Sequence, residues 1–224
     1  ALPISLEACR RTLKRIRAGI EILKTDEKAA KAFRFANEAM ANQRVHSIFT
    51  RELRQNPDQT LRIEDFDIPK NRSWRHFQLA FILLNLPALV DPTHPDRVNP
   101  THAKADLLWF PTGGGKTEAY LGVAAFAMGI RRLQGEIAGY SGAAGVSVLM
   151  RYTLRLLTLQ QFQRATALIC AMELIRRSDE ATWGTEPFRI GLWVGQRSTP
   201  NWTKDAAEII RQRHGIYEGL GGKG

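Results

Sequence analysis

The first quarter of the chain shows a helical pattern of apolar and polar residues. Apolar positions recur every three or four residues and predict two helices, over about 6–23 and 26–53. Thr25 or Asp26 can cap the second helix, because a short side chain with an oxygen accepts hydrogen bonds from backbone N–H groups of the first turn. We therefore expect residues 1–70 to form a helical segment that packs on the domain after it.

From residue 71 onward, short apolar runs alternate with longer amphipathic stretches. Strands that alternate with helices favour an α/β fold, in which helices cover both faces of a parallel sheet. The sequence therefore predicts one α/β nucleotide-binding domain over residues 71–224. Its buried strands are expected at 105–110, 146–150 and 188–194, its helices at 75–86, 118–133, 156–177 and 205–213, and its loops at 91–99 and the glycine-rich 135–145.

A glycine-rich run follows the first predicted strand and ends in Lys-Thr. Its sequence is Pro111-Thr112-Gly113-Gly114-Gly115-Lys116-Thr117-Glu118. Glycines let successive backbone N–H groups point at one spot, and the N-terminus of the following helix adds a field that favours anions. In such a loop Lys116 reaches the β- and γ-phosphates of a nucleoside triphosphate, and the Thr117 hydroxyl ligates Mg²⁺. A glycine-rich turn without a ligand is the alternative.

The form Pro-Thr-Gly-Gly-Gly-Lys-Thr resembles the first motif of superfamily 2 helicases and translocases, and Phe110 stands where the general phosphate-loop pattern has its first glycine. The resemblance implies ATP as the nucleotide. It also implies a role for the Arg-x-x-Gln before the loop, because a glutamine amide can both donate to and accept from adenine. A glutamine on a helix surface is the alternative. The implied ATP-binding residues are Arg75, Gln78, Thr112, Gly113, Gly114, Gly115, Lys116, Thr117 and Glu118, with Lys116 and Thr117 catalytic and Thr117 the Mg²⁺ ligand.

A second motif follows the second predicted strand. Arg155 and Gln160 match the Arg-x-Leu-x-x-Gln of motif Ia in the same family, although the Pro-Thr that precedes it there is missing. In the family this segment holds the sugar-phosphate backbone of one nucleic-acid strand, a contact that reads no bases. A polar loop and a solvated helix start are the alternatives. The residues implied in contact with DNA are Arg151, Thr153, Arg155, Gln160 and, in the loop after the third strand, Arg197.

Together these segments resemble the first RecA-like domain of a superfamily 2 helicase, and more closely the helicase of the DISARM anti-phage system. The resemblance covers about residues 26–213. It implies an ATP-dependent DNA helicase or translocase in bacterial defence, with a DUF1998-type partner subunit (DrmB). The closer resemblance depends on the phosphate loop with its flanks and on three further runs, which are Phe77-Gln78-Leu79-Ala80-Phe81, Asp91-Pro92-Thr93-His94-Pro95-Asp96-Arg97 and Met150-Arg151-Tyr152-Thr153-Leu154-Arg155-Leu156-Leu157-Thr158-Leu159-Gln160-Gln161-Phe162.

Composition agrees with this picture without proving it. A net charge of +10 favours a polyanionic partner, but the excess is spread along the chain, so a solvated basic surface explains it equally well. Two distant cysteines do not make a disulfide scaffold, and no Cys/His spacing typical of zinc occurs. No signal peptide and no apolar run of membrane-spanning length is recognised, so a cytoplasmic location is expected.

Two parts of a complete motor are missing from the sequence. No Asp-Glu-x-His follows the third predicted strand, and no second RecA-like domain supplies an arginine finger. We therefore expect the chain to be a fragment of a longer polypeptide, whose other parts are needed for ATP hydrolysis. The alternative, if the chain were whole, is a non-catalytic module for nucleotide and DNA binding. A phosphate-loop kinase is disfavoured, since the motif Ia remnant has no role there.

Overall fold

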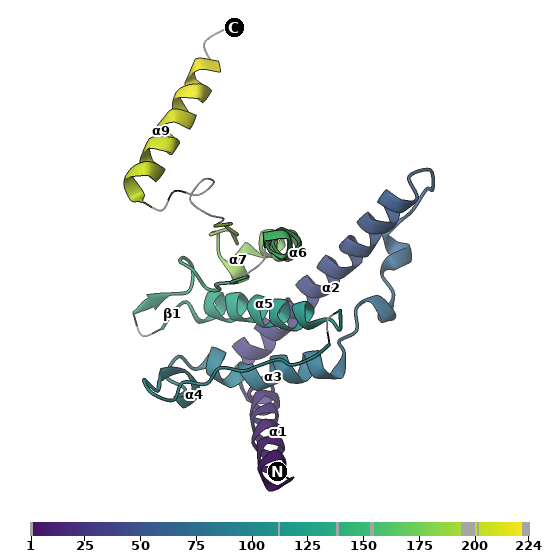
Figure 1. Cartoon of the computed structure of the whole chain (residues 1–224), viewed down its shortest axis with the longest axis vertical. Coiled ribbons are helices and arrows are strands. Elements are labelled where there is room, and N and C mark those ends of the chain that lie inside the picture. The colour runs from purple at the N-terminus through teal and green to yellow at the C-terminus, as the bar shows by residue number, and fades with distance from the viewer. Residues whose placement is uncertain are drawn as a thin grey trace. The chain divides into compact units, whose positions relative to one another are not determined.

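The computed structural model describes residues 2–111, 113–137, 139–152, 155–193, 200 and 202–220 (Figure 1). The chain divides into two compact units, residues 1–189 and 190–224. The second unit contains helix α9 (Thr203–Leu220). The first unit contains α1 (Leu2–Thr25), α2 (Glu27–Gln55), the 3-10 turns η1 (Ile63–Phe66) and η2 (Pro69–Asn71), α3 (His76–Val90), α4 (Pro95–Val98), α5 (Lys116–Gln134), β1 (Glu136–Ile137), β2 (Tyr140–Ser141), α6 (Arg155–Ser178) and α7 (Glu180–Trp183).

The core of the first unit is made by helices. Helix α5 packs against α2 and α3, α2 also packs against α6, and α1 packs against α3 (Figure 1). Four alanines give α2 a smooth face, so that α5 can approach it closely. Each large side chain that is fully buried contributes about 1.5–3 kcal/mol; these side chains are Phe126, Ile82, Leu86, Leu121, Ile130, Leu168 and Met172.

The helices agree with the sequence pattern. The predicted N-cap of α2 is confirmed, because Asp26 Oδ1 accepts a hydrogen bond of 2.9 Å from the backbone N–H of Ala29. The helices predicted over 118–133 and 156–177 are found at Lys116–Gln134 and Arg155–Ser178. These elements depend on short-range interactions, which the sequence displays directly.

The predicted α/β fold with its parallel sheet is wrong. Within the described residues the only strand pairing joins β1 to β2, two strands of two residues each, and it is antiparallel. The apolar runs at 105–110 and 146–150 pair with no strand there, and the side chains of Leu107 and Trp109 are 84% and 87% exposed. A buried strand needs hydrogen-bonded neighbours as well as apolar residues, and an apolar run by itself cannot supply them.

Local contacts hold these extended runs instead. Arg15 on α1 forms ion pairs with Asp106, at 2.5 Å, and with Asp96, at 3.3 Å, which ties the chain before the phosphate loop to the first helix. The glycine-rich stretch predicted to be a loop forms the β1–β2 hairpin. Arg131 holds the chain after this hairpin, because its guanidinium donates hydrogen bonds to Ser141 O at 3.0 Å and Ser147 Oγ at 2.7 Å. The predicted loop over 91–99 also contains the single turn α4.

A buried ion pair fixes the far end of α6. The side chain of Arg176 donates hydrogen bonds to Glu173, Glu180 and the carbonyl oxygen of Gly184, which join α6 to α7. Several interactions lower the pKa of the Glu173 carboxyl to about 2, and the largest of them is the hydrogen bonding from the Arg176 guanidinium. A further hydrogen bond to Glu173, from the backbone N–H of Phe188, draws the following segment onto the same carboxylate.

Candidate nucleotide-binding site

The predicted phosphate loop leads directly into α5. Gly113 and Gly115 have φ angles of 78° and 90°, in the left-handed region that glycine adopts without strain. Gly115 is the N-cap of α5, and with no side chain it cannot cap the N–H groups of the first turn. The free N–H groups and the helix dipole make this end of α5 a place for an anion.

Helix α3 holds the back of the loop through the Arg-x-x-Gln residues. The buried Gln78 amide accepts a hydrogen bond from the Arg75 backbone N–H and donates one to Gly115 O, each of 2.8 Å. The Arg75 guanidinium donates to Gly114 O, also at 2.8 Å. The structure thus brings Arg75 and Gln78 against the loop. Contact of Gln78 with adenine stays a prediction.

Lys116 and Thr117 occupy the first two positions of α5. The Lys116 ammonium folds back over the loop entrance and donates to the carbonyl oxygens of Phe110 and Pro111. The Thr117 hydroxyl is buried and lies 3.2 Å from the hydroxyl of Tyr120, one turn along the helix. Both side chains are at the helix end where a nucleotide phosphate would sit. Their roles toward phosphate and Mg²⁺ stay predictions.

The structure adds an aromatic contact that the sequence analysis missed. The rings of Phe77 and Phe110 stack with centroids 3.9 Å apart and planes 15° apart. This stack joins the start of α3 to the entrance of the loop, next to Gly114. Phe77 lies between the two residues of the Arg-x-x-Gln motif, so the sequence could have indicated that Phe77 is near the loop. The sequence could not have indicated that its stacking partner is Phe110.

The structure also adds a link between α5 and α6. Arg164 of α6 forms an ion pair with Glu118 Oε1 in the first turn of α5. The other oxygen, Glu118 Oε2, is buried, and no hydrogen-bond partner is found for it in the described part of the chain. The two residues are 46 positions apart, so no local pattern could have paired them.

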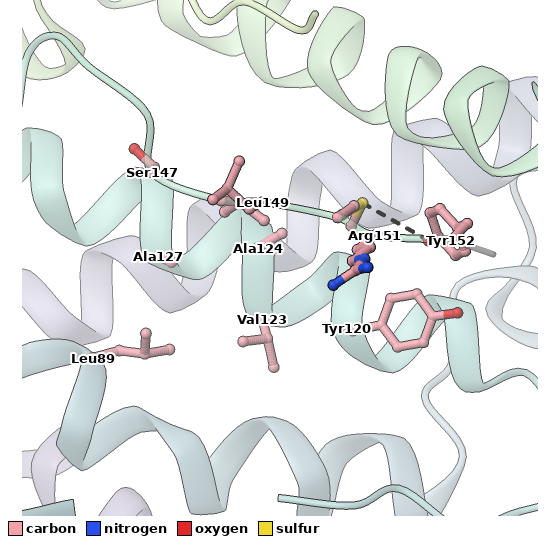
Figure 2. A pocket seen from close by; sticks show the side chains of 11 residues that line it. Leu89, Tyr120, Val123, Ala124, Ala127, Ser147, Leu149, Arg151 and Tyr152 are labelled. Carbon is pink, nitrogen blue, oxygen red and sulfur yellow. Dashed lines mark hydrogen bonds between the residues drawn. The ribbon is translucent and has the colours of Figure 1, made fainter. Parts of the chain in front are cut away.

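A cavity of about 590 Å³ lies between α3, α5 and the extended segment before α6 (Figure 2). It adjoins the loop through Tyr120 but is not the phosphate loop itself. Arg151 and Tyr152 border it beside Tyr120, and most of its other lining residues are apolar (Figure 2). Burial, followed by the proximity of Tyr120, raises the pKa of Tyr152 to about 12, so this phenol is neutral at physiological pH.

The residues implied in DNA contact are only partly described. Arg151 and Gln160 are exposed, one before α6 and the other in its second turn. Helix α6 begins at Arg155, but the side chain of this residue is outside the described part. Three predicted site residues lie outside the described residues altogether: Thr112, Thr153 and Arg197. A shared nucleic-acid surface therefore stays a prediction.

Metal-ligating side chains are not clustered in the part of the chain that the structure describes. The described residues contain no group of three or more His, Cys, Asp or Glu side chains that could hold a metal ion. The Thr117 hydroxyl stays the predicted protein ligand of Mg²⁺. No described helix combines the length and the apolar character needed to cross a membrane.

Comparison with known proteins gives one informative match. No family model matches the chain. The chain is 45% identical over 206 residues to the DISARM protein DrmA of Bacillus paralicheniformis (strain ATCC 9945a / NCIMB 11709 / CD-2). The match covers 91% of this chain and 17% of that protein, so the chain spans about one sixth of its relative's length. The similarity supports a DISARM-related family, as the sequence resemblance implied, whereas the helicase assignment stays a prediction.

Proposed function

We propose that this chain, whose similarity supports a DISARM-related family, is the ATP-binding part of a DNA helicase or translocase that acts in anti-phage defence. The observation that carries the proposal is the phosphate loop. Two left-handed glycines lead into the N-terminus of α5, and Lys116 and Thr117 follow at once. This is the arrangement that binds the phosphates of a nucleotide.

The loop residues would share the work of binding. Backbone N–H groups of Gly113–Gly115 and the first turn of α5 would hold the β- and γ-phosphates, and Lys116 would turn from its carbonyl partners toward them. Mg²⁺, when bound at Thr117, would neutralise phosphate charge. Arg75 and Gln78 hold the loop from behind, so that it needs little rearrangement when the nucleotide arrives.

The proposed nucleic-acid partner is DNA, held by its backbone near the start of α6. Arg151 and Gln160 are exposed there, and we include Thr153 and Arg155 by the motif resemblance. Arg197 is proposed as a separate backbone contact, by its place after the third predicted strand. The net charge of +10 supports a polyanionic partner. We also propose a cytoplasmic location and a DUF1998-type partner subunit (DrmB), in line with the DISARM-related similarity.

We expect this chain to bind ATP but not to hydrolyse it by itself. The sequence lacks an Asp-Glu-x-His and an arginine finger, so hydrolysis of ATP would require parts outside it. The chain by itself should therefore bind ATP without turning it over at a useful rate. A non-catalytic nucleotide- and DNA-binding assembly module is the second candidate.

The test is a titration of the chain with a fluorescent ATP analogue, with and without Mg²⁺. We expect Lys116→Ala to weaken binding at least tenfold, because the lysine charge would face the phosphates of a bound nucleotide, while thermal unfolding changes little. Lys104→Ala is the matched control, since Lys104 pairs with Asp96 and lies away from the loop. Equal affinity in wild type and Lys116→Ala, or no binding by the wild type, would refute the proposal.

DNA-stimulated ATP turnover in a longer polypeptide that contains this chain separates the two candidates. Turnover that Lys116→Ala abolishes supports the motor. ATP and DNA binding without turnover in the longer polypeptide supports the assembly module.

A further inference from the structure

The contact between α5 and α6 connects the two parts of the proposed site. Glu118 follows directly after Thr117, and Arg164 reaches it from α6, four residues after Gln160. The side chains of Arg164 and Glu118 are 35% and 20% exposed, so water only partly screens the pair. The ion pair therefore joins the helix that begins at the phosphate loop to the helix that begins at the proposed DNA contacts.

Each of the two helices also carries a buried side-chain oxygen. Glu118 Oε2 on α5 and Gln161 Oε1 on α6 are both buried, and each lacks a hydrogen-bond partner in the described residues. Buried oxygens without partners are unfavourable, and most proteins avoid them. A hydrogen bond gained by either oxygen would stabilise a shifted arrangement of the two helices.

The unpaired Glu118 oxygen also lies next to the loop. A Cβ built on Gly115 would be 3.3 Å from Glu118 Oε2 and 2.7 Å from Gln78 Nε2. The loop backbone, the glutamine that holds it and the carboxylate paired to α6 are therefore packed together. Any shift of Gly115 when phosphate binds would be felt by Glu118, because the interior there leaves little free space.

Arg164 also acts on the segment before α6. Its positive charge is close enough to Tyr152 to lower the pKa of that phenol slightly, against the larger effects of burial and of Tyr120. Arg164 is therefore near both the first turn of α5 and the chain that leads from Arg151 into α6. No other ionic contact between α5 and α6 is present in the described part of the chain.

We propose that Arg164 is a positioning residue that couples the phosphate loop to the DNA-binding start of α6 through its ion pair with Glu118. The inference rests on the proposed function and adds a means of regulation to the same site. Nucleotide bound at the loop would set the position of Glu118. Because Arg164 pairs with Glu118, a shift of Glu118 would also move Arg164 and helix α6. By reciprocity, DNA bound at α6 would change nucleotide affinity by the same factor.

The test measures that factor in this chain. A non-hydrolysable ATP analogue with Mg²⁺ is titrated with and without a single-stranded DNA of about 20 nucleotides, longer than a usual binding footprint. We expect DNA to change the dissociation constant of wild type for the nucleotide at least 5-fold, in either direction. Arg164→Met should reduce this factor below about 2-fold, with each separate affinity within about 3-fold of wild type, and Arg164→Lys should restore it.

A matched control lies on the same helix. Arg177 pairs with Glu173 within α6 and does not reach α5, so Arg177→Met removes an ion pair without touching the proposed link. Its coupling factor should equal that of wild type. Thermal unfolding of all variants is measured in parallel, so that a loss of folding stability is not mistaken for a loss of coupling.

The outcomes distinguish this inference from the proposed function. If wild type binds both ligands but Arg164→Met keeps the coupling, or wild type shows none, the inference is wrong and the proposed function stands. A uniform loss of both affinities in Arg164→Met and Arg164→Lys means a structural role and also overturns it. If wild type does not bind the nucleotide, the proposed function itself fails, and the inference with it.

Discussion

The substitution Gly115→Ala tests whether the phosphate loop is held by helix α3 as the structure describes. An alanine at φ 90° must adopt the left-handed region, which costs about 1–2 kcal/mol. Its methyl group would also lie 2.7 Å from Gln78 Nε2, so the glutamine must move and lose its bond to Gly115 O, at about 0.5–1.5 kcal/mol. We therefore expect the unfolding free energy to fall by about 2–3 kcal/mol.

Gly113→Ala is the matched control. Gly113 has nearly the same backbone conformation, with φ 78°, but a Cβ there meets no atom within 4 Å. It should lose only the backbone part, about 1–2 kcal/mol. Urea unfolding followed by tryptophan fluorescence measures both variants, and the difference between their unfolding free energies is expected to be about 1 kcal/mol.

The extra loss should depend on Gln78. In a Gln78→Ala background the contact with the new methyl group is absent, so Gly115→Ala and Gly113→Ala should become equally destabilising. Equal losses already in the wild-type background would show that Gln78 does not hold the loop. An unequal loss that persists without Gln78 would assign the effect to another neighbour, such as Glu118 Oε2 at 3.3 Å, and would refute the reasoning.

Two further predictions concern contacts that hold the helices together. The pKa of Glu173 is lowered from 4.5 to about 2, chiefly by hydrogen bonds from Arg176, so its ionised form stabilises the fold fully above about pH 5, and this stabilisation is lost as the pH falls toward 2. Urea unfolding should find Glu173→Gln less stable than wild type at pH 7, with the gap closing between pH 5 and 2.5; a gap independent of pH contradicts this. Trp74→Phe removes the 2.6 Å bond from Nε1 to Asn37 Oδ1 and should lower the unfolding free energy by about 1 kcal/mol. Unchanged thermal stability would mean that this bond contributes nothing.

Several parts of the site could be read from the sequence because they depend on near neighbours. Gly113 and Gly115 lie just before Lys116 in the sequence, and their left-handed conformation is one that glycine adopts without strain. The start of α2 at Asp26 is likewise a local matter of capping. Arg75 and Gln78 were assigned to ATP binding by resemblance. The structure places both against the loop, and their contact with ATP stays a prediction.

The contacts that join these parts could not be read in the same way. Glu118 and Arg164 are 46 residues apart, and nothing in either neighbourhood indicates a partner. The stacking of Phe77 on Phe110 is likewise a matter of how α3 meets the loop. Such contacts depend on helix packing, which follows from the whole core and not from a local pattern.

The sequence by itself determined the main helices, the glycine loop with its Lys-Thr, and the DISARM-related resemblance. Only the tertiary structure decided the fold class, because the apolar runs around Leu107 and Leu149 are equally compatible with buried strands and with extended exposed chain. Local periodicity records which residues are apolar, whereas a sheet requires partners whose backbone N–H and C=O groups are in register. In the described residues those partners are absent, and helices α2, α3, α5 and α6 form the core.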